Sequence, residues 1–317
     1  MKRDRQDRER FRSNPSRFIE ESIRAYVASS PANRLRSFGG TPIFDEPLVG
    51  FADGDDPIFT QYKTIVGEMH LTPREALQQR STDTSGKDNH EIPDIGVISW
   101  VLPITRETRL SNRRETRGPS LRWNHTRWDG QEFNLELSRH IVSLLEQLGH
   151  NAVAPEAAPF YTIHRLPEGL IANWSQRHVA YAAGLGTFSL NDGFITPRGI
   201  AMRCGSVVTD LALPPSPRPY PNHLANCLFY VDGSCRRCIE RCPDGAITEK
   251  GHDKEKCRHV LFVVQRPWME GTHGEGYIGR YPGCGLCQVD VPCEDRIPVL
   301  NKKHRQDDMS RPSGGFE

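Results

Sequence analysis

The chain has 317 residues, of which 36% are hydrophobic, and its formal net charge is only +1. This length gives room for one large domain or two ordinary ones. The near-neutral charge argues against a protein that holds polyanions through bulk charge, and no stretch approaches the roughly 18 apolar residues of a membrane span. Met1 to Ser16 are mostly charged residues and Ser, without the apolar core of a secretory signal, so we expect a cytoplasmic protein.

The N-terminal region, residues 1 to 40, is a charged segment in which we predict one helix from about Pro15 to Ala28. Asn14 is the expected N-cap, and Pro15 suits the first helical position because its ring already has a helical φ. Four apolar residues on or near one face give the helix a buried side: Phe18, Ile19, Ile23 and Val27.

The region from 41 to 215 mixes strand-like and helical patterns, so we expect a fold of the α+β or α/β class. The apolar run 96–102 predicts a buried strand that ends at Pro103. The apolar spacing over 133–148 predicts an amphipathic helix closed by Gly149. Residues 81 to 90 indicate a surface loop.

An arginine-rich stretch occupies residues 106–127, with seven arginines against two glutamates and with Trp123, His125 and Trp128 among or beside them. Such a mixture of cations and aromatic rings suits contact with tRNA phosphates and bases, with an anionic small substrate, or with the phosphate of a cofactor. A solvated, flexible loop is the plain alternative.

A proline-rich segment, residues 213–221, has five prolines in nine positions and marks the expected domain boundary. Residues 41–215 would then form a cofactor- and substrate-binding domain. Residues 222–300 would form a cysteine-rich module, and the polar residues 301–317 a disordered tail.

The cysteine-rich module contains most of the bacterial ferredoxin pattern C-x2-C-x2-C-x3-C-P, in which thiolates bind two [4Fe–4S] clusters. Cys235, Cys238 and Cys242 with Pro243 match it, but the usual first cysteine is replaced by Asp232. Cys227 is the available substitute. We therefore predict one cluster on Cys227, Cys235, Cys238 and Cys293, and a second on Cys242, Cys257, Cys284 and Cys287.

Two other uses of these cysteines are less consistent with the sequence. A zinc ribbon also takes four thiolates, but eight cysteines exceed one zinc site and Pro243 is a ferredoxin feature. Disulfides are uncommon in a cytosolic chain with paired cysteines, where metal binding is the more frequent role. Cys204, the ninth cysteine, is either a small core residue or faces a cofactor.

The segment before the proline-rich boundary carries a family resemblance. Trp174 to Gly186, with Ala183-Gly-Leu-Gly186 at its end, is followed by Asn191 and by Ile195-Thr-Pro-Arg198. With the double-cluster module after it, this order resembles epoxyqueuosine reductases and their relatives, which are also related to reductive dehalogenases. The resemblance covers residues 95 to 300.

The resemblance implies an α/β domain that holds a corrinoid (cobalamin) and two [4Fe–4S] clusters that feed electrons to it. The residues expected near that cofactor are Arg177, Gly184, Gly186, Arg198 and Cys204. Asp88 and His90 only approximate the D-x-H-x-x-G motif, because Pro93 stands at its glycine. A corrinoid would therefore bind without that histidine ligand.

The acid of the family is not at its usual position. Aligning through Arg177 and the Ala-Gly-Leu-Gly segment puts Leu170 where epoxyqueuosine reductases have a catalytic aspartate, and no aspartate occurs between Asn151 and Asn191. Because a general acid must reach the reacting atom, the expected donors are the nearby Glu168, Tyr161 and His164.

Three functions remain open from the sequence. The first is a cobalamin- and iron–sulfur-dependent reductase of an unidentified substrate, served by an external low-potential donor of the ferredoxin or flavodoxin type. The second is epoxyqueuosine reductase of tRNA queuosine biosynthesis, which the arginine-rich stretch supports weakly. The third is a non-catalytic iron–sulfur electron carrier. The substrate would be a small molecule or a tRNA-borne group, and no membrane partner is expected.

Overall fold

The computed structural model describes residues 2–84, 94–166, 169–270 and 275–299, in a fold that mixes helices and strands as predicted. Its centre is a four-stranded sheet in the order β3-β4-β10-β5. Every strand pairing within the described residues is antiparallel, so the sheet fits the α+β class and not the parallel α/β class.

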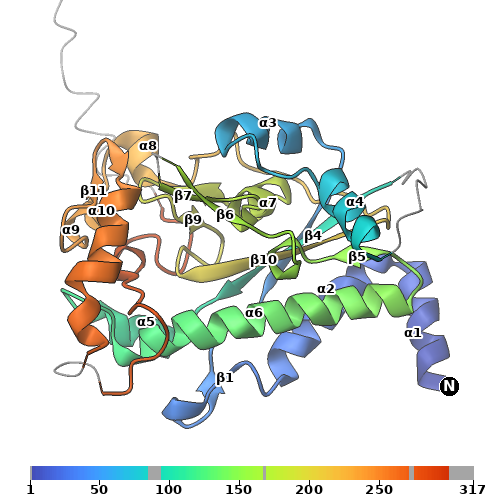
Figure 1. Ribbon diagram of the computed structural model, residues 1–317, viewed down its shortest axis with the longest axis horizontal. Coiled ribbons are helices and arrows are strands. Elements are labelled where there is room, and N and C mark those ends of the chain that lie inside the picture. The colour runs from blue at the N-terminus through green and yellow to red at the C-terminus, as the bar shows by residue number, and fades with distance from the viewer. Residues whose placement is uncertain (1, 85–93, 167–168, 271–274, 300–317) are drawn as a thin grey trace, which may run out of the picture.

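The elements follow one another from the N-terminal helices to the cysteine-rich segment (Figure 1). The helices are α1 Lys2–Ser13, α2 Pro15–Ser29, α3 Pro57–Ile65, α4 Pro73–Thr84, α5 Arg106–Arg113, α6 Leu121–Gln147, α7 Gln176–Ala182, α8 Leu228–Asp232, α9 Arg237–Glu240 and α10 Lys254–His259. The strands are β1 Arg34–Leu35, β2 Thr41–Pro42, β3 Leu48–Asp53, β4 Gly96–Pro103, β5 Ala152–Val153, β6 Ile163–Leu166, β7 Gly169–Ala172, β8 Thr187–Phe188, β9 Phe194–Ile195, β10 Met202–Thr209, β11 Ile247–Thr248 and β12 Gly251–His252.

The predicted N-terminal helix and central strand are confirmed. The Asn14 side chain accepts a hydrogen bond from the Arg17 amide and caps α2, whose four predicted apolar residues are buried. Strand β4 is buried along its whole length and ends at Pro103. The predicted helix over 133–148 begins earlier than its apolar spacing indicates, because Ser120 caps α6 through the Trp123 amide.

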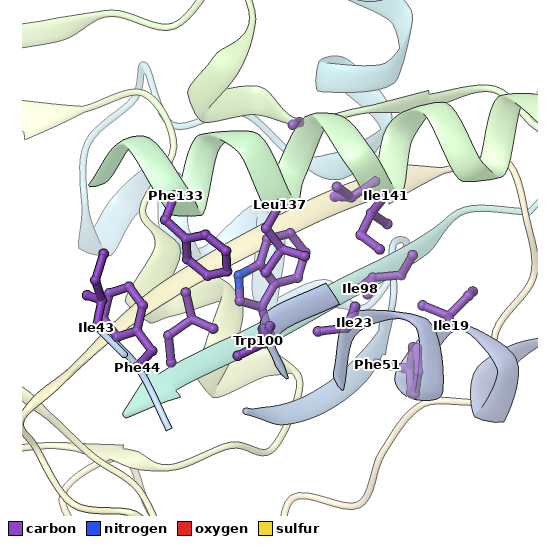
Figure 2. Close-up of a cluster of buried hydrophobic side chains, with 14 of the residues drawn as sticks. Ile19, Ile23, Ile43, Phe44, Phe51, Ile98, Trp100, Phe133, Leu137 and Ile141 are labelled. Atoms are coloured by element: carbon purple, nitrogen blue, oxygen red, sulfur yellow. The ribbon is translucent and has the colours of Figure 1, made fainter. Parts of the chain in front are cut away.

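The main core lies between α6, α2 and one face of the sheet. Successive β4 side chains alternate between the two faces, so Ile98, Trp100 and Leu102 join this core. Figure 2 shows side chains of α6 directed onto β4 around Trp100, with residues of α2 completing the cluster. Full burial of an aromatic side chain of this size makes the contact one of the larger single contributions to stability.

The opposite face of the sheet is covered by α3, α4 and α7, and its core includes Val97 and Val101 of β4. Two histidines lie at this face. His70 is 0% exposed and stacks on Trp174, and its Nε2 accepts a hydrogen bond from the Ser175 amide at 3.1 Å. His178 lies beside Tyr62, whose hydroxyl donates to the His178 carbonyl.

The proline-rich segment is not a free linker where the structure describes it. The Ser216 amide donates to the Phe51 carbonyl at 2.9 Å, and the Phe51 amide donates to the Ser216 hydroxyl at 2.9 Å. The segment therefore runs beside β3. The expected loop at 81–90 begins within α4, and its remaining residues lie outside the described ranges. None of the described helices combines the length and apolarity needed to cross a membrane.

The first prediction concerns the buried link between α6 and the sheet. Asn134 accepts a hydrogen bond from Trp100 Nε1 at 2.9 Å and donates to the Cys204 carbonyl at 3.1 Å. Changing Asn134→Leu leaves the indole N–H unpaired, so we expect a loss of about 1–3 kcal/mol in the free energy of unfolding, measured by denaturant titration. Glu136→Leu, at an exposed position of α6, should change it by less than about 0.5 kcal/mol.

The second prediction is a loss of stability in mild acid. Burial lowers the pKa of His70 to about 4, and burial together with Arg177 lowers the pKa of His178 to about 3. The unfolded chain therefore binds protons first as the pH falls below about 6.5, and the folded state loses stability between about pH 6.5 and pH 4. We expect melting temperatures to fall over that window. His70→Gln should flatten the dependence, and an unchanged slope would contradict this assignment.

Candidate functional site

The eight cysteines of the C-terminal segment fall into two groups of four, each lining its own cavity. Cys227, Cys235, Cys238 and Cys293 line the smaller cavity. Cys242, Cys257, Cys284 and Cys287 line part of a larger one. These groups are the two sets expected from the sequence, and their role as cluster ligands stays a prediction. Within the described ranges, no three His, Cys, Asp or Glu side chains form a site for a single metal ion.

Short elements present these thiols. Cys227 caps α8, Cys238 lies in α9 and Cys257 lies in α10. Between Cys284 and Cys287 of the second group stands Gly285, with a left-handed φ of +60°. A Cβ atom there would lie 2.2 Å from the Trp123 ring of α6, so only glycine allows this turn to pack against that helix.

Burial and repulsion from neighbouring thiols raise the pKa of several cysteines in both groups. Burial, with the neighbouring Cys227 and Cys235, raises the pKa of Cys238 to about 12. Burial, with Cys284 and Cys242, raises the pKa of Cys257 to about 11. Metal ligands must be thiolates, so iron binding at these groups would release protons and supply the missing positive charge.

The larger cavity lies at the end of the central sheet, where β10 begins, and has a volume of about 620 Å³. This size falls in the range of about 300–1,000 Å³ that small-molecule and cofactor sites occupy. One wall is the second cysteine group. Other lining residues come from α6, α7 and the first residues of β10, and they include Arg127, Gln176, Arg177 and Arg203.

Three arginines of this cavity are held in place by the protein. Arg203 donates to Gln131 Oε1 at 2.5 Å and to the Arg127 carbonyl at 3.2 Å. Burial and repulsion from Arg127 lower the pKa of Arg203 to about 10, so it remains charged at neutral pH. Arg127 donates to the Tyr281 hydroxyl at 2.5 Å, and Arg177 donates to the Asp192 carbonyl. The cavity therefore carries a fixed positive charge.

Of the predicted cofactor residues, Arg177 and Cys204 line this cavity. Burial raises the pKa of Cys204 to about 12, so its thiol is neutral. The other three do not line it. A Cβ atom on Gly184 would meet the Pro217 carbonyl at 2.2 Å, and one on Gly186 would meet the Ile195 carbonyl at 2.4 Å, so both glycines serve close backbone packing. Arg198 lies 3.7 Å from Asp45 in an ion pair.

The predicted proton donors do not line the cavity where the structure describes them. His164, in β6, is exposed and bonds to the Thr162 hydroxyl at 2.9 Å. Tyr161 is partly buried, and burial together with Glu156 raises its pKa to about 12. Glu168 lies outside the described residues, as do Asp88 and His90. Leu170, at the position of the family aspartate, is 50% exposed on β7.

Most of the arginine-rich stretch forms α5 and the start of α6, and a loop is present only at 114–120, where Arg114 and Arg117 are exposed. Arg109 and Arg113 both contact Glu294, with Nε–Oε distances of 3.1 and 2.7 Å. Arg122 contacts Glu107 at 2.8 Å and stacks on Phe38. These arginines support the protein's own architecture, chiefly by holding the cysteine-rich segment against α5.

Sequence reasoning missed the carboxylate of the larger cavity. Glu156 lies in the short 3-10 turn Pro155–Ala157 that follows β5, and its side chain faces the cavity. It belongs to no motif or periodic pattern. No signal in the sequence could have singled it out. Gln176 and Arg127 of the same cavity stand in stretches that the sequence had singled out for other reasons.

Comparison with known proteins gives a consistent set of relatives, although no protein-family model matches the chain. An epoxyqueuosine reductase of Bacillus anthracis is 30% identical over 272 residues, covering 77% of this chain and 64% of that protein. One of Bacillus cereus has the same identity and coverage. A crystal structure of an epoxyqueuosine reductase with an epoxyqueuosine-modified tRNA-Tyr stem loop is 17% identical, with a TM-score of 0.43 over 88% of this chain and 66% of that chain.

The aligned region spans slightly less than two thirds of the length of the curated relatives. It includes more than three quarters of this chain, at an identity typical of distant members of one enzyme family. The chain is thus similar to epoxyqueuosine reductases over most of its length.

Proposed function

We propose that this protein is an iron–sulfur oxidoreductase that reduces epoxyqueuosine, free or carried by tRNA. The observation that carries the proposal is the larger cavity, which is lined both by a group of four cysteines and by fixed arginines. The named relatives favour epoxyqueuosine over an unidentified substrate. A cavity of this size beside the cysteines also favours an enzyme over a simple electron carrier.

The two cysteine groups fit two [4Fe–4S] clusters, because each offers four thiols around one cavity. The arginines of the larger cavity fit a corrinoid, since its rim of amide carbonyls and its phosphate accept hydrogen bonds. Arg127, Arg177 and Arg203 are the residues that would hold it. When bound, these groups would supply one-electron transfer and a strongly reducing cobalt centre.

The chain's own residues have three tasks in this proposal. The arginines orient a ligand and offset negative charge that reduction brings into the cavity. Trp123, packed on Gly285, lines the cavity beside the second cysteine group and fills space there that water would otherwise occupy. The electrons come from an external low-potential donor of the ferredoxin or flavodoxin type.

The third prediction is a metal content of about eight irons per chain after anaerobic reconstitution, since each cluster has four. Cys235→Ala should disturb only the first cluster, and Cys242→Ala or Cys284→Ala only the second, as followed by electron paramagnetic resonance of the reduced protein. Cys204→Ala is the matched control and should keep all the iron, because Cys204 lies outside both groups. Four irons per chain, or stoichiometric zinc, would contradict the proposal.

The fourth prediction tests the activity. Reconstituted protein should bind cobalamin in an absorbance titration and, with a low-potential reductant, convert a tRNA stem loop carrying epoxyqueuosine to its queuosine form, measured by mass spectrometry. Arg177→Leu should weaken cobalamin binding roughly tenfold, the loss of about one charge-assisted hydrogen bond. Arg198→Leu, outside the cavity, is its control. Intact clusters with neither cobalamin binding nor turnover would support the electron-carrier alternative.

A further inference from the structure

Glu156 is the single Asp or Glu among the described residues that line the larger cavity. It reaches the cavity from the turn after β5, a part of the chain distant from the segment in which the family carries its acid. A reductive cleavage that breaks a C–O bond needs protons as well as electrons. The placement of a carboxyl group here is therefore the feature to explain.

Two glutamine side chains hold this carboxylate from opposite sides. Gln131 Nε2, from α6, donates to Glu156 Oε1 at 3.0 Å. Gln176 Nε2, from the first turn of α7, donates to Glu156 Oε2 at 3.0 Å. Each carboxylate oxygen thus receives one hydrogen bond and keeps further acceptor capacity toward the cavity.

The direction of both amide groups is fixed by their other partners. Arg203 has only donors, so the Gln131 oxygen must face it and the Gln131 NH₂ must face Glu156. On the other side, Trp174 Nε1 donates to the Ser206 hydroxyl at 3.0 Å, and Ser206 donates to Gln176 Oε1 at 2.7 Å. The Gln176 NH₂ is thereby also directed at Glu156.

This network connects three walls of the cavity to one carboxyl group. The glutamines of α6 and α7 donate to Glu156, and residues of β10 donate to those glutamines, so the position of Glu156 does not depend on a single contact. The neutral Cys204 thiol and the charged Arg203 are its electrostatic neighbours. Tyr161 is also within electrostatic reach of Glu156 but does not line the cavity.

We propose that Glu156 is the catalytic acid of this reductase and carries the transferred proton in the reduced, cofactor-loaded enzyme. The inference rests on the proposed function. Reduction of an epoxide to an alkene consumes two electrons and two protons, and its oxygen leaves as water. The electrons come from the external low-potential donor. Glu156 gives one proton to the departing oxygen as the C–O bonds break, and solvent supplies the second and reprotonates Glu156.

The first test compares Glu156→Gln, Glu156→Asp and Tyr161→Phe in the reconstituted holoenzyme. With the epoxyqueuosine-bearing stem loop, Glu156→Gln should lower kcat by roughly 10²–10⁴-fold, the usual contribution of a general acid. Iron content and cobalamin affinity should stay at the wild-type values. Glu156→Asp should recover part of the rate, and Tyr161→Phe should stay within about threefold of wild type because Tyr161 does not line the cavity. Wild-type turnover by Glu156→Gln would overturn the inference while leaving the proposed function intact.

The second test needs no substrate. Infrared difference spectra, reduced minus oxidised, should show a protonated carboxyl band in the wild-type holoenzyme that shifts in D₂O. The band should be absent from Glu156→Gln and present in Tyr161→Phe. Identical spectra for wild type and Glu156→Gln would overturn the inference whatever the substrate. If the wild-type protein shows the band but does not reduce epoxyqueuosine, the proposed substrate is wrong and the role of Glu156 still stands.

Discussion

The arrangement of the site depends on a buried carboxylate, Glu294, which is 2% exposed. A charge in that position is unfavourable by several kcal/mol unless it is paired, and here Arg109, Arg113 and the Asp290 amide all contact it. Its neighbour Cys293 accepts a hydrogen bond from the Ile200 amide at 2.8 Å. The ion pairs of Glu294 therefore hold this segment against α5, and the bond to the Cys293 carbonyl fastens it to the chain that leads into β10.

The cavity is a consequence of that attachment. Because the cysteine-rich segment is held against the start of β10, the second cysteine group faces the end of the sheet, where Arg203 and Cys204 emerge. Four thiolates and an electron-loaded cofactor would concentrate negative charge there. Fixed arginines offset this negative charge most effectively in a site with little water, because charges interact more strongly at low dielectric. The fold thus places the arginines and the second cysteine group around one cavity.

Local sequence patterns predicted the helices and strands, whereas contacts between residues far apart in the chain determine the geometry of the site. The Asn14 cap, the β4 run and the spacing of eight cysteines are short-range signals, and the structure places each as the sequence indicates. The structural role of Arg109 could not be predicted from the arginine-rich stretch, because its partner Glu294 is 185 residues away, whereas Arg127 of the same stretch does line the larger cavity. No spacing rule within the stretch carries that information, since burial of an ion pair is a property of the folded chain.

The position of the proposed acid could not be predicted from the sequence either. Alignment looks for it at residue 170, but Leu170 lies half exposed on β7, which pairs with β6 and contributes nothing to the described lining of the cavity. A carboxylate at that place on this backbone would face solvent. Glu156, fourteen positions earlier, reaches the cavity because β5 ends beside β10 and the following turn passes Gln131 and Gln176. In this chain the carboxyl group of the cavity is therefore delivered by the turn after β5 and not by the β6–β7 hairpin.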